Sequence, residues 1–580
     1  MREQLLTRHF LERFLENDLV SPDADRHAAI AMVSGGFLTL GLFVSVLISV
    51  QFLFMPFQSP GRTADLALYH RFFFIAISTI VMALVAVATW DALSIDPRDT
   101  AILGPLPIPR AVIVRAKLRA VAIVAVGASL AISALSSVLH PVLTVANLPI
   151  GLLTPPALIL AHLAVTLGAG LFAFASIVAL RELLRAVLGA RFSRISAHLQ
   201  AVLIVLIVTS LLLLPATLVR ATRADGYAAR MLPPLWFLGL QEAVAGPLIT
   251  ELPVRELPPR FKRAEDAAAA HYRTNVARLK PLAGYAVVAS IASLLLAIGS
   301  YYWNSRELPL PLVGSRASKF RTRRFLSRAA TFALVRRPVS QAGFFLTLHC
   351  LFRSAPHRVV MSGCSAVSLA IAILLLASIS RSVARDPSVV PASAFLTQTI
   401  VLMIMLGGFR HVMRVPADIG GNKLFRLAWV GNGEAFLAGV RRAALVGVVL
   451  PVVILLLPTN LYLLGGTKAL MHSVSGLLLA AAFLSVLTGR STNLPFVASY
   501  GPTPDLNTLG PAVLIGGFFG ISIFSGIEHY ALSDLSTAAM FWGALLAVAV
   551  VPRLAADRGP WLDLPTAFDV PAGTTRLDLG

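Results

Sequence analysis

The chain has 580 residues, of which 57% are hydrophobic and only 13% are charged. Soluble domains carry about 25% charged residues, so the composition excludes a soluble enzyme and a disordered scaffold. The 49 Lys and Arg exceed the 28 Asp and Glu by 21, an excess that membrane proteins place in cytoplasmic loops and that gives little support for a nucleic-acid partner. Two cysteines, Cys350 and Cys364, are too few for a disulfide framework or a cysteine metal site and are expected to be packing residues.

Twelve apolar stretches predict membrane-spanning helices, because a helix needs about 20 mostly apolar residues to cross the hydrocarbon core. The predicted fold class is all-α, a polytopic membrane protein with about twelve transmembrane helices in two six-helix halves. The first half contains the spans 28–55, 72–90, 118–139, 154–180, 201–219 and 282–303. The second half contains the spans 359–380, 395–408, 443–464, 469–488, 509–530 and 537–551.

The remaining segments complete the predicted domain organisation. Residues 1–27 form a cytoplasmic amphipathic helix rather than a signal peptide, because they carry both charge signs and no cleavage-type segment follows the first span. The first half covers 28–303 and the second 359–551, joined by a basic cytoplasmic linker at 304–358. Residues 552–580 are a cytoplasmic tail. With this orientation, 34 of the 49 basic residues lie on the cytoplasmic side, as in the cytoplasmic (inner) membrane of a bacterium.

Both halves open with an amphipathic stretch, which is one sign of a repeated plan. The first contains Leu5, Leu6, Phe10, Phe14 and Leu15 among charged residues, and the second contains Phe325, Leu326, Phe332 and Leu334. Such helices lie in the membrane interface with their apolar face in lipid; a plain helical linker is the alternative. Repeated halves are common in transporters, which place their pathway between them.

The predicted spans hold few groups that could do chemistry. They contain no central Asp or Glu, and the main embedded titratable residues are His162 and His472, with Glu528 and His529 at the end of the eleventh span. We expect each histidine to be a packed, hydrogen-bonded residue. Ion-driven transporters usually need embedded carboxylates, so this absence disfavours coupling to an ion gradient, although backbone carbonyls at a broken helix remain an alternative for sodium. The phosphate-loop, His-Glu-x-x-His and Gly-x-Ser-x-Gly motifs are all absent.

The segment 91–117 breaks the helical pattern after the second span. Its prolines, Pro97, Pro105, Pro107 and Pro109, cannot share one uninterrupted helix. A short helix between Pro97 and Gly104, with Asp99 near its start, fits the signals. Ile102, Leu103, Leu106 and Ile108 give it an apolar face, so the segment predicts a compact knob that another protein could grip.

The run from Asp99 to Leu118 resembles the cytoplasmic stretch of ABC transporter permeases of the exporter type. That family has an acidic residue, a Leu-rich turn, a Leu-Pro pair, a basic residue and a small residue before Lys. After Asp99, this chain has Ile102-Leu103, Leu106-Pro107-Ile108, Arg110 and Ala116-Lys117-Leu118. The resemblance implies that this segment couples the chain to a separate ATPase subunit, which binds the ATP. The implied coupling residues are Asp96, Arg98, Asp99, Leu103, Leu106, Pro107, Arg110 and Lys117.

The chain departs from that family because it has twelve predicted spans where six are usual, which suggests a large or tandem form. Asp418, Phe425, Arg426, Glu434 and Arg441 then occupy a second coupling position. The loop 220–280 is predicted to be extracytoplasmic, and its Pro233, Pro234, Trp236 and Phe237 suit a short interfacial helix that caps an exit path, or a simple membrane anchor.

The sequence therefore predicts the membrane subunit of an ATP-driven exporter, in contact with membrane lipid and with a separate ATPase. We expect no catalytic residues, cofactor, metal or nucleic acid, and a homo-oligomer is left open. The alternatives are an ion-gradient-driven secondary transporter, and a membrane enzyme or assembly factor. The substrate and the direction of transport do not follow from the sequence.

Overall fold

The protein is seen in a computed structural model. The structure describes residues 2–15, 26–50, 60–90, 92–93, 99, 102–103, 105–146, 154–222, 226–246, 259–305, 335–385, 393–417, 425, 429, 432–489, 494–497 and 520–555. These residues form helices and turns, with no strand among them. The prediction of an all-α membrane protein is confirmed, since nine helices in these ranges are long and apolar enough to cross a membrane.

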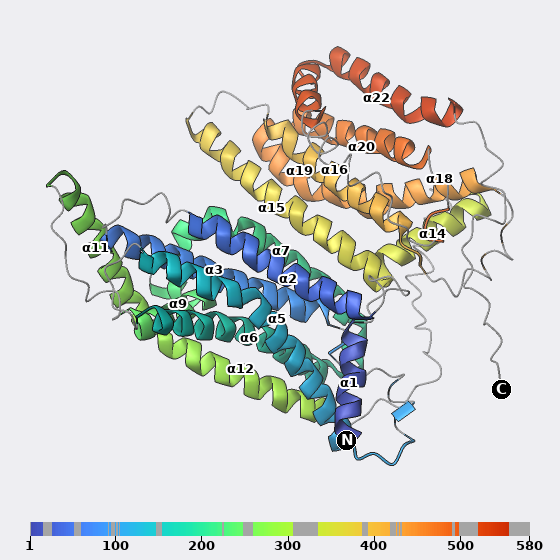
Figure 1. The fold of residues 1–580 in the computed structure, drawn as a ribbon. Helices are drawn as coiled ribbons and strands as arrows, with labels where there is room; N and C mark the ends of the chain where they lie inside the picture. Colours follow the sequence, from blue (N-terminus) through green and yellow to red (C-terminus); the bar gives the residue numbers. More distant parts are fainter. Residues whose placement is uncertain are drawn as a thin grey trace. The chain divides into compact units, whose positions relative to one another are not determined.

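The chain divides into two compact units, Met1–Ser315 and Arg316–Gly580, and each has a hydrophobic core of its own. Unit 1 contains these helices: α1 (Arg2–Leu15), α2 (Arg26–Ser49), α3 (Pro60–Ala88), α5 (Arg110–Ala146), α6 (Thr154–Leu188), α7 (Phe192–Thr222), α8 (Gly226–Arg230), α9 (Pro233–Ala245), α11 (Pro259–Leu279) and α12 (Ala283–Asn304). Within this unit, α1 lies at one end of the helix bundle and α11 at the other (Figure 1).

Helix α3 is the centre of unit 1. It packs against α5, α6, α7, α9 and α11. Its most apolar stretch is 72% buried, against 17% for α7, so α3 lies inside the bundle and α7 exposes most of its apolar surface. An apolar surface of that size suits lipid rather than water.

Unit 2 contains these helices: α14 (Pro338–Arg353), α15 (Ala355–Arg385), α16 (Ser393–Arg414), α18 (Gly433–Ala444), α19 (Leu450–Leu464), α20 (Gly466–Gly489), a helix at 520–531 and α22 (Leu535–Ala555). A π-helical stretch, Leu445–Val449, joins α18 to α19. Cys350 is buried in α14, and burial raises the pKa of its thiol to about 12, as fits a packing residue.

Wherever the predicted spans are described they are almost entirely helical, but several boundaries differ. Helix α3 begins at Pro60 rather than at Phe72, which brings His70 and Arg71 into the bundle. The ninth predicted span is the end of a longer apolar run, Gly433–Leu464. For the eleventh span, only residues from 520 onward are described, and the count of twelve stays a prediction.

Two further segments show more structure than the sequence alone gives. The predicted extracytoplasmic loop 220–280 contains α8, α9 and α11. The amphipathic helix at the N-terminus is present as α1, but Leu6 and Phe10 are buried in the core of unit 1 rather than in lipid. The second amphipathic stretch, 325–334, lies outside the described residues.

Candidate functional site

The predicted coupling segment of unit 1 has an exposed tip. Among its described residues, Ile102 is 66% exposed and Leu106 is 47% exposed, and Pro107 and Arg110 are also exposed. Asp99, Ile102 and Leu103 are helical, as the sequence predicts. Two apolar side chains beside a cation on a turn form a surface on which a protein partner could dock.

The base of this segment is buried against α1. Asp99 is only 2% exposed, and its Oδ1 lies 3.5 Å from Nε2 of His9. Lys117 is also 2% exposed, and its Nζ lies 4.8 Å from the centre of the Phe10 ring, a cation–π contact. Leu103 is half-buried. Asp99 and Lys117 therefore position the segment rather than face a partner.

The C-terminal end of α3, which leads into the segment, is also held firmly. Trp90 is fully buried, and its Nε1 donates to Oγ of Ser196 at 2.8 Å. Gln200 donates to the carbonyl oxygen of Val87 at 3.0 Å. The segment therefore starts from a fixed point on the bundle. Asp96 and Arg98 lie outside the described residues.

The second predicted coupling position, in unit 2, is only partly described. Phe425 stacks on Trp429 with ring centres 6.0 Å apart, and both rings pack edge-on against Phe436. Glu434, half exposed, forms an ion pair with the buried Arg441. These contacts pack the segment inward, and Asp418 and Arg426 lie outside the described residues.

Helix α9 carries the four residues predicted to cap an exit path. Pro233 and Pro234 begin the helix, Trp236 is half-buried with its Nε1 bonded to the Arg230 carbonyl, and Phe237 is 2% exposed. The helix packs against α3, α6 and α12. The predicted interfacial helix is therefore embedded in the bundle of unit 1, and it is too short to cross a membrane.

Because α9 is embedded, it brings a carboxylate to the central helix. Nη1 of Arg71 on α3 lies 2.6 Å from Oε1 of Glu242 on α9, and their side chains are 3% and 0% exposed. Tyr272 of α11 donates to Oε2 of the same carboxylate at 2.8 Å. The predicted spans were expected to hold no central Asp or Glu, and Glu242 does not lie in one of them. It still places a buried carboxylate in the bundle of unit 1, because it comes from a segment that is not a span.

Three histidine rings lie next to this ion pair. His140 lies between His70 and His162, with ring centres 5.7 and 5.4 Å away, and Phe74 packs edge-on against His162. Nε2 of Gln241 lies 2.9 Å from Nδ1 of His162. His162 is thus packed and hydrogen-bonded, as expected. No group of three metal-ligating side chains with suitable geometry occurs among the described residues.

Helix α11 is fastened to the start of α3 by two more polar contacts. The Glu265 carboxylate accepts from the backbone N–H of Gly61, which the N-terminus of a helix leaves unpaired. Nδ1 of His271 lies 2.7 Å from Oδ1 of Asp65. Together with Tyr272, these contacts make α11 part of the polar end of unit 1.

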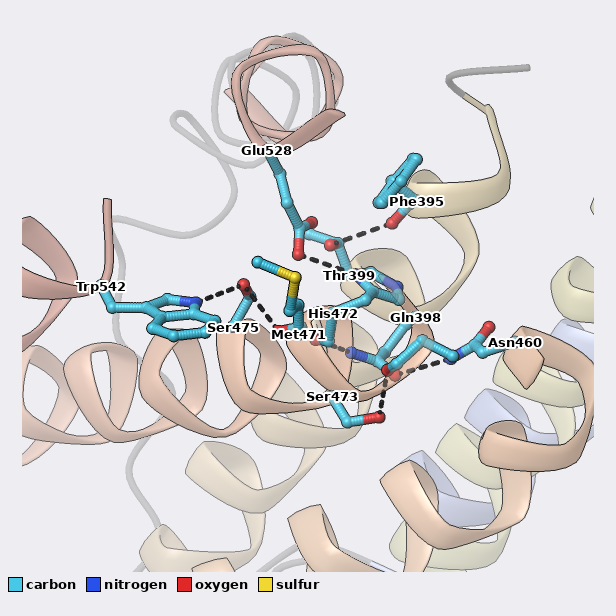
Figure 2. Close-up of polar contacts among 11 residues, drawn as sticks. Phe395, Gln398, Thr399, Asn460, Met471, His472, Ser473, Ser475, Glu528 and Trp542 are labelled. Carbon is cyan, nitrogen blue, oxygen red and sulfur yellow. Dashed lines mark hydrogen bonds and ion pairs between the residues drawn. The ribbon is translucent and has the colours of Figure 1, made fainter. Parts of the chain in front are cut away.

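Unit 2 has a smaller buried polar centre (Figure 2). Nδ1 of His472 on α20 lies 2.7 Å from Oε1 of Glu528 on helix 520–531. Gln398 of α16 donates to the His472 carbonyl oxygen at 2.9 Å and accepts from Asn460 of α19 at 3.0 Å. Four helices meet at this point, so the predicted packing role of His472 is also correct.

Sequence reasoning missed Arg71, Glu242 and Tyr272. These three residues contact one another but lie far apart in the sequence, and hydropathy assigns Arg71 to a loop. One signal was present, because an acidic residue within a short apolar helix is unusual near a membrane core. The chain matches no family model, no curated protein and no solved structure.

Proposed function

We propose that the chain is the membrane subunit of an ATP-driven exporter and that its segment at 96–110 docks on a separate ATPase. The observation that carries this proposal is the exposed tip of Ile102, Leu106, Pro107 and Arg110 on a buried base. A docking element that transmits force needs accessible contact residues and a rigid attachment. The chain would lie in a bacterial inner membrane with both termini cytoplasmic, in keeping with its basic residues.

The arrangement of α3 supports this role. At one end α3 leads into the docking segment, and in its first half it carries Arg71, bonded to Glu242 of α9. Displacement of the segment by an ATPase would move a helix that contacts most of unit 1. Such rigid-body repacking is a standard route from a partner's motion to a change of conformation.

The test replaces the exposed apolar tip by charge in the full chain. The double substitution Ile102→Asp and Leu106→Asp should abolish co-purification of a phosphate-loop ATPase from the native membrane and its vanadate-sensitive activity. Each buried interface anchor contributes about 2 kcal/mol, so loss of both should weaken binding by roughly 1,000-fold. The matched control is Tyr227→Asp on α8, at a side chain that is 75% exposed.

Two results would refute the proposal. One is an ATPase that stays bound and active after both tip substitutions. The other is transport by the isolated chain in vesicles with an imposed ion gradient and no ATP. Because Asp99 is buried against His9, its substitution would disturb folding and is unsuitable for this test.

An ion-gradient-driven transporter is the second candidate, and one observation favours it. The buried pair of His472 and Glu528 is the kind of embedded titratable group on which such transporters depend. Uptake that an ionophore abolishes, in vesicles without ATP, would favour this candidate over the exporter.

A further inference from the structure

We propose that His472 and Glu528 form a proton-binding site in unit 2, and that its proton holds helix 520–531 against α20. This inference concerns unit 2 alone and does not depend on the source of energy for transport. Figure 2 shows Glu528 pointing from its helix toward the His472 ring. The two side chains are each 1% exposed, with Nδ1 and Oε1 2.7 Å apart.

Each member of the pair has a second polar atom that is buried. Nε2 of His472 and Oε2 of Glu528 have no hydrogen-bond partner within the part of the chain that the structure describes. Buried polar atoms are nearly always paired. Two such atoms on adjacent, almost fully buried side chains indicate a site built to take up something small.

Charge indicates that the bound species is a proton. An ionised Glu528 beside a neutral His472 would leave one negative charge in the helix interior, which is costly in a membrane. One added proton gives an imidazolium–carboxylate pair with no net charge. A metal ion fits less well, because no group of three metal-ligating side chains occurs among the described residues.

No other charged group that the structure describes near the pair balances the negative charge that an ionised Glu528 would carry. His529 follows Glu528, but its ring packs against Phe395, 5.2 Å between centres. Lys468 is exposed in the first turn of α20. The described part of α19 brings only the amide of Asn460 to the site.

On α15, Arg381 follows Ile379 of the apolar cluster beside the pair, but it is exposed and its Nε donates to the carbonyl oxygen of Ala377 at 3.0 Å. The charged residues of α16 and α18 lie further away. Arg441 of α18 bonds Thr488, 16 residues beyond His472 on α20 and therefore about 24 Å away along the helix. Arg410, His411 and Arg414 are at the last turns of α16, whereas Phe395 is at its start. On α22, Nε1 of Trp542 donates to Oγ of Ser475 on α20 at 2.9 Å.

Loss of the proton should loosen the C-terminal helices. Helix 520–531 is tied to α20 by the His472–Glu528 contact, and the Phe395 ring also packs edge-on against His472. Without the proton, a neutral imidazole and an ionised carboxylate remain, and water must enter or the helix must move to solvate the charge. Helix 520–531 and α22 are therefore the elements whose packing the proton controls.

The experiment measures hydrogen exchange of the full chain in lipid nanodiscs as the pH rises, corrected for intrinsic exchange rates. We expect the wild type to lose protection in 520–531 and in α22 over about two pH units, as one titrating proton requires. Glu528→Gln and His472→Gln should both remove that pH dependence. The matched control, Trp542→Phe, loses the bond to Ser475 but no titratable group, and should keep the pH dependence.

Three outcomes would overturn the proposal. The first is a wild type whose exchange in 520–531 is independent of pH. The second is a Glu528→Gln chain whose hydrogen exchange depends on pH as that of the wild type does. A His529→Gln chain that is the only variant to lose this pH dependence would count equally against the proposal. The third is stoichiometric binding of added Zn²⁺ that both pair substitutions abolish, which would make the pair a metal site.

Discussion

The buried ion pair of unit 1 gives the sharpest test of its architecture. Substituting Glu242→Gln keeps the shape of the side chain but removes its charge, so Arg71, which is 3% exposed, is left as an unpaired buried cation. Breaking a buried ion pair in this way costs about 3–5 kcal/mol. Glu242→Ala should cost about 1 kcal/mol more, because Tyr272 also loses its acceptor at 2.8 Å.

The assay is SDS-induced unfolding of the full chain in detergent micelles, followed by tryptophan fluorescence. The double variant Arg71→Met, Glu242→Leu should lie within about 1 kcal/mol of the wild type, because an apolar pair of similar volume replaces both charges. The pair of Glu3, which is 25% exposed, and the exposed Arg119, 3.1 Å apart, supplies the control, since Glu3→Gln should cost less than about 1 kcal/mol. Equal losses in Glu242→Gln and in the double variant would refute this reasoning.

Three further substitutions test other parts of the fold. Phe10→Ala should destabilise unit 1 by about 3–5 kcal/mol in the same unfolding assay, because its fully buried ring packs on Lys117. Gly239→Val should expose α9 to limited proteolysis, because any Cβ there would collide with the carbonyl oxygen of Leu279. Asp534→Ala should fray the start of α22. Hydrogen bonds from Ser536, and then Thr537, lower the pKa of Asp534 to about 2. The cap of the wild type is therefore intact above about pH 4 and is lost as the pH falls toward 2. The wild type should lose helical circular dichroism over that range, and the variant should not.

Long apolar runs were predictable because hydropathy depends on local composition alone. The start of α3 was not, because Arg62, Asp65 and His70 make 60–71 look like a loop. The partner that makes Arg71 tolerable inside the bundle is Glu242, 171 residues further along the chain. No local pattern contains that information.

The predicted coupling segment shows a similar limit. Its turn signals and its apolar residues predicted a helical knob. Asp99, Ile102 and Leu103 are helical, and Leu106 is exposed in the turn that follows. The sequence could not say which charged residues face outward, because Asp99 and Arg110 are equally polar. Packing of α1 buries Asp99 and leaves Arg110 exposed, which changes the first from a docking residue to a positioning residue.

The polar centre of unit 1 contains a recognisable local arrangement. His162 lies near the start of α6, and the ring of Phe74 from α3 packs edge-on against it at 5.8 Å and 81°. A polar side chain from a further helix, Gln241 of α9, meets Nδ1 of the histidine. The arrangement thus has three parts, each on its own helix.

Unit 2 contains the same three parts. His472 lies near the start of α20, the ring of Phe395 from α16 packs against it at 5.2 Å and 79°, and Glu528 of a further helix meets its Nδ1. The sequences around the two histidines are not alike, so only the geometry brings this out. One packing solution used in both units favours the hypothesis of repeated halves. Only the second unit has a carboxylate at the third position, so we expect only that unit to bind a proton through its histidine.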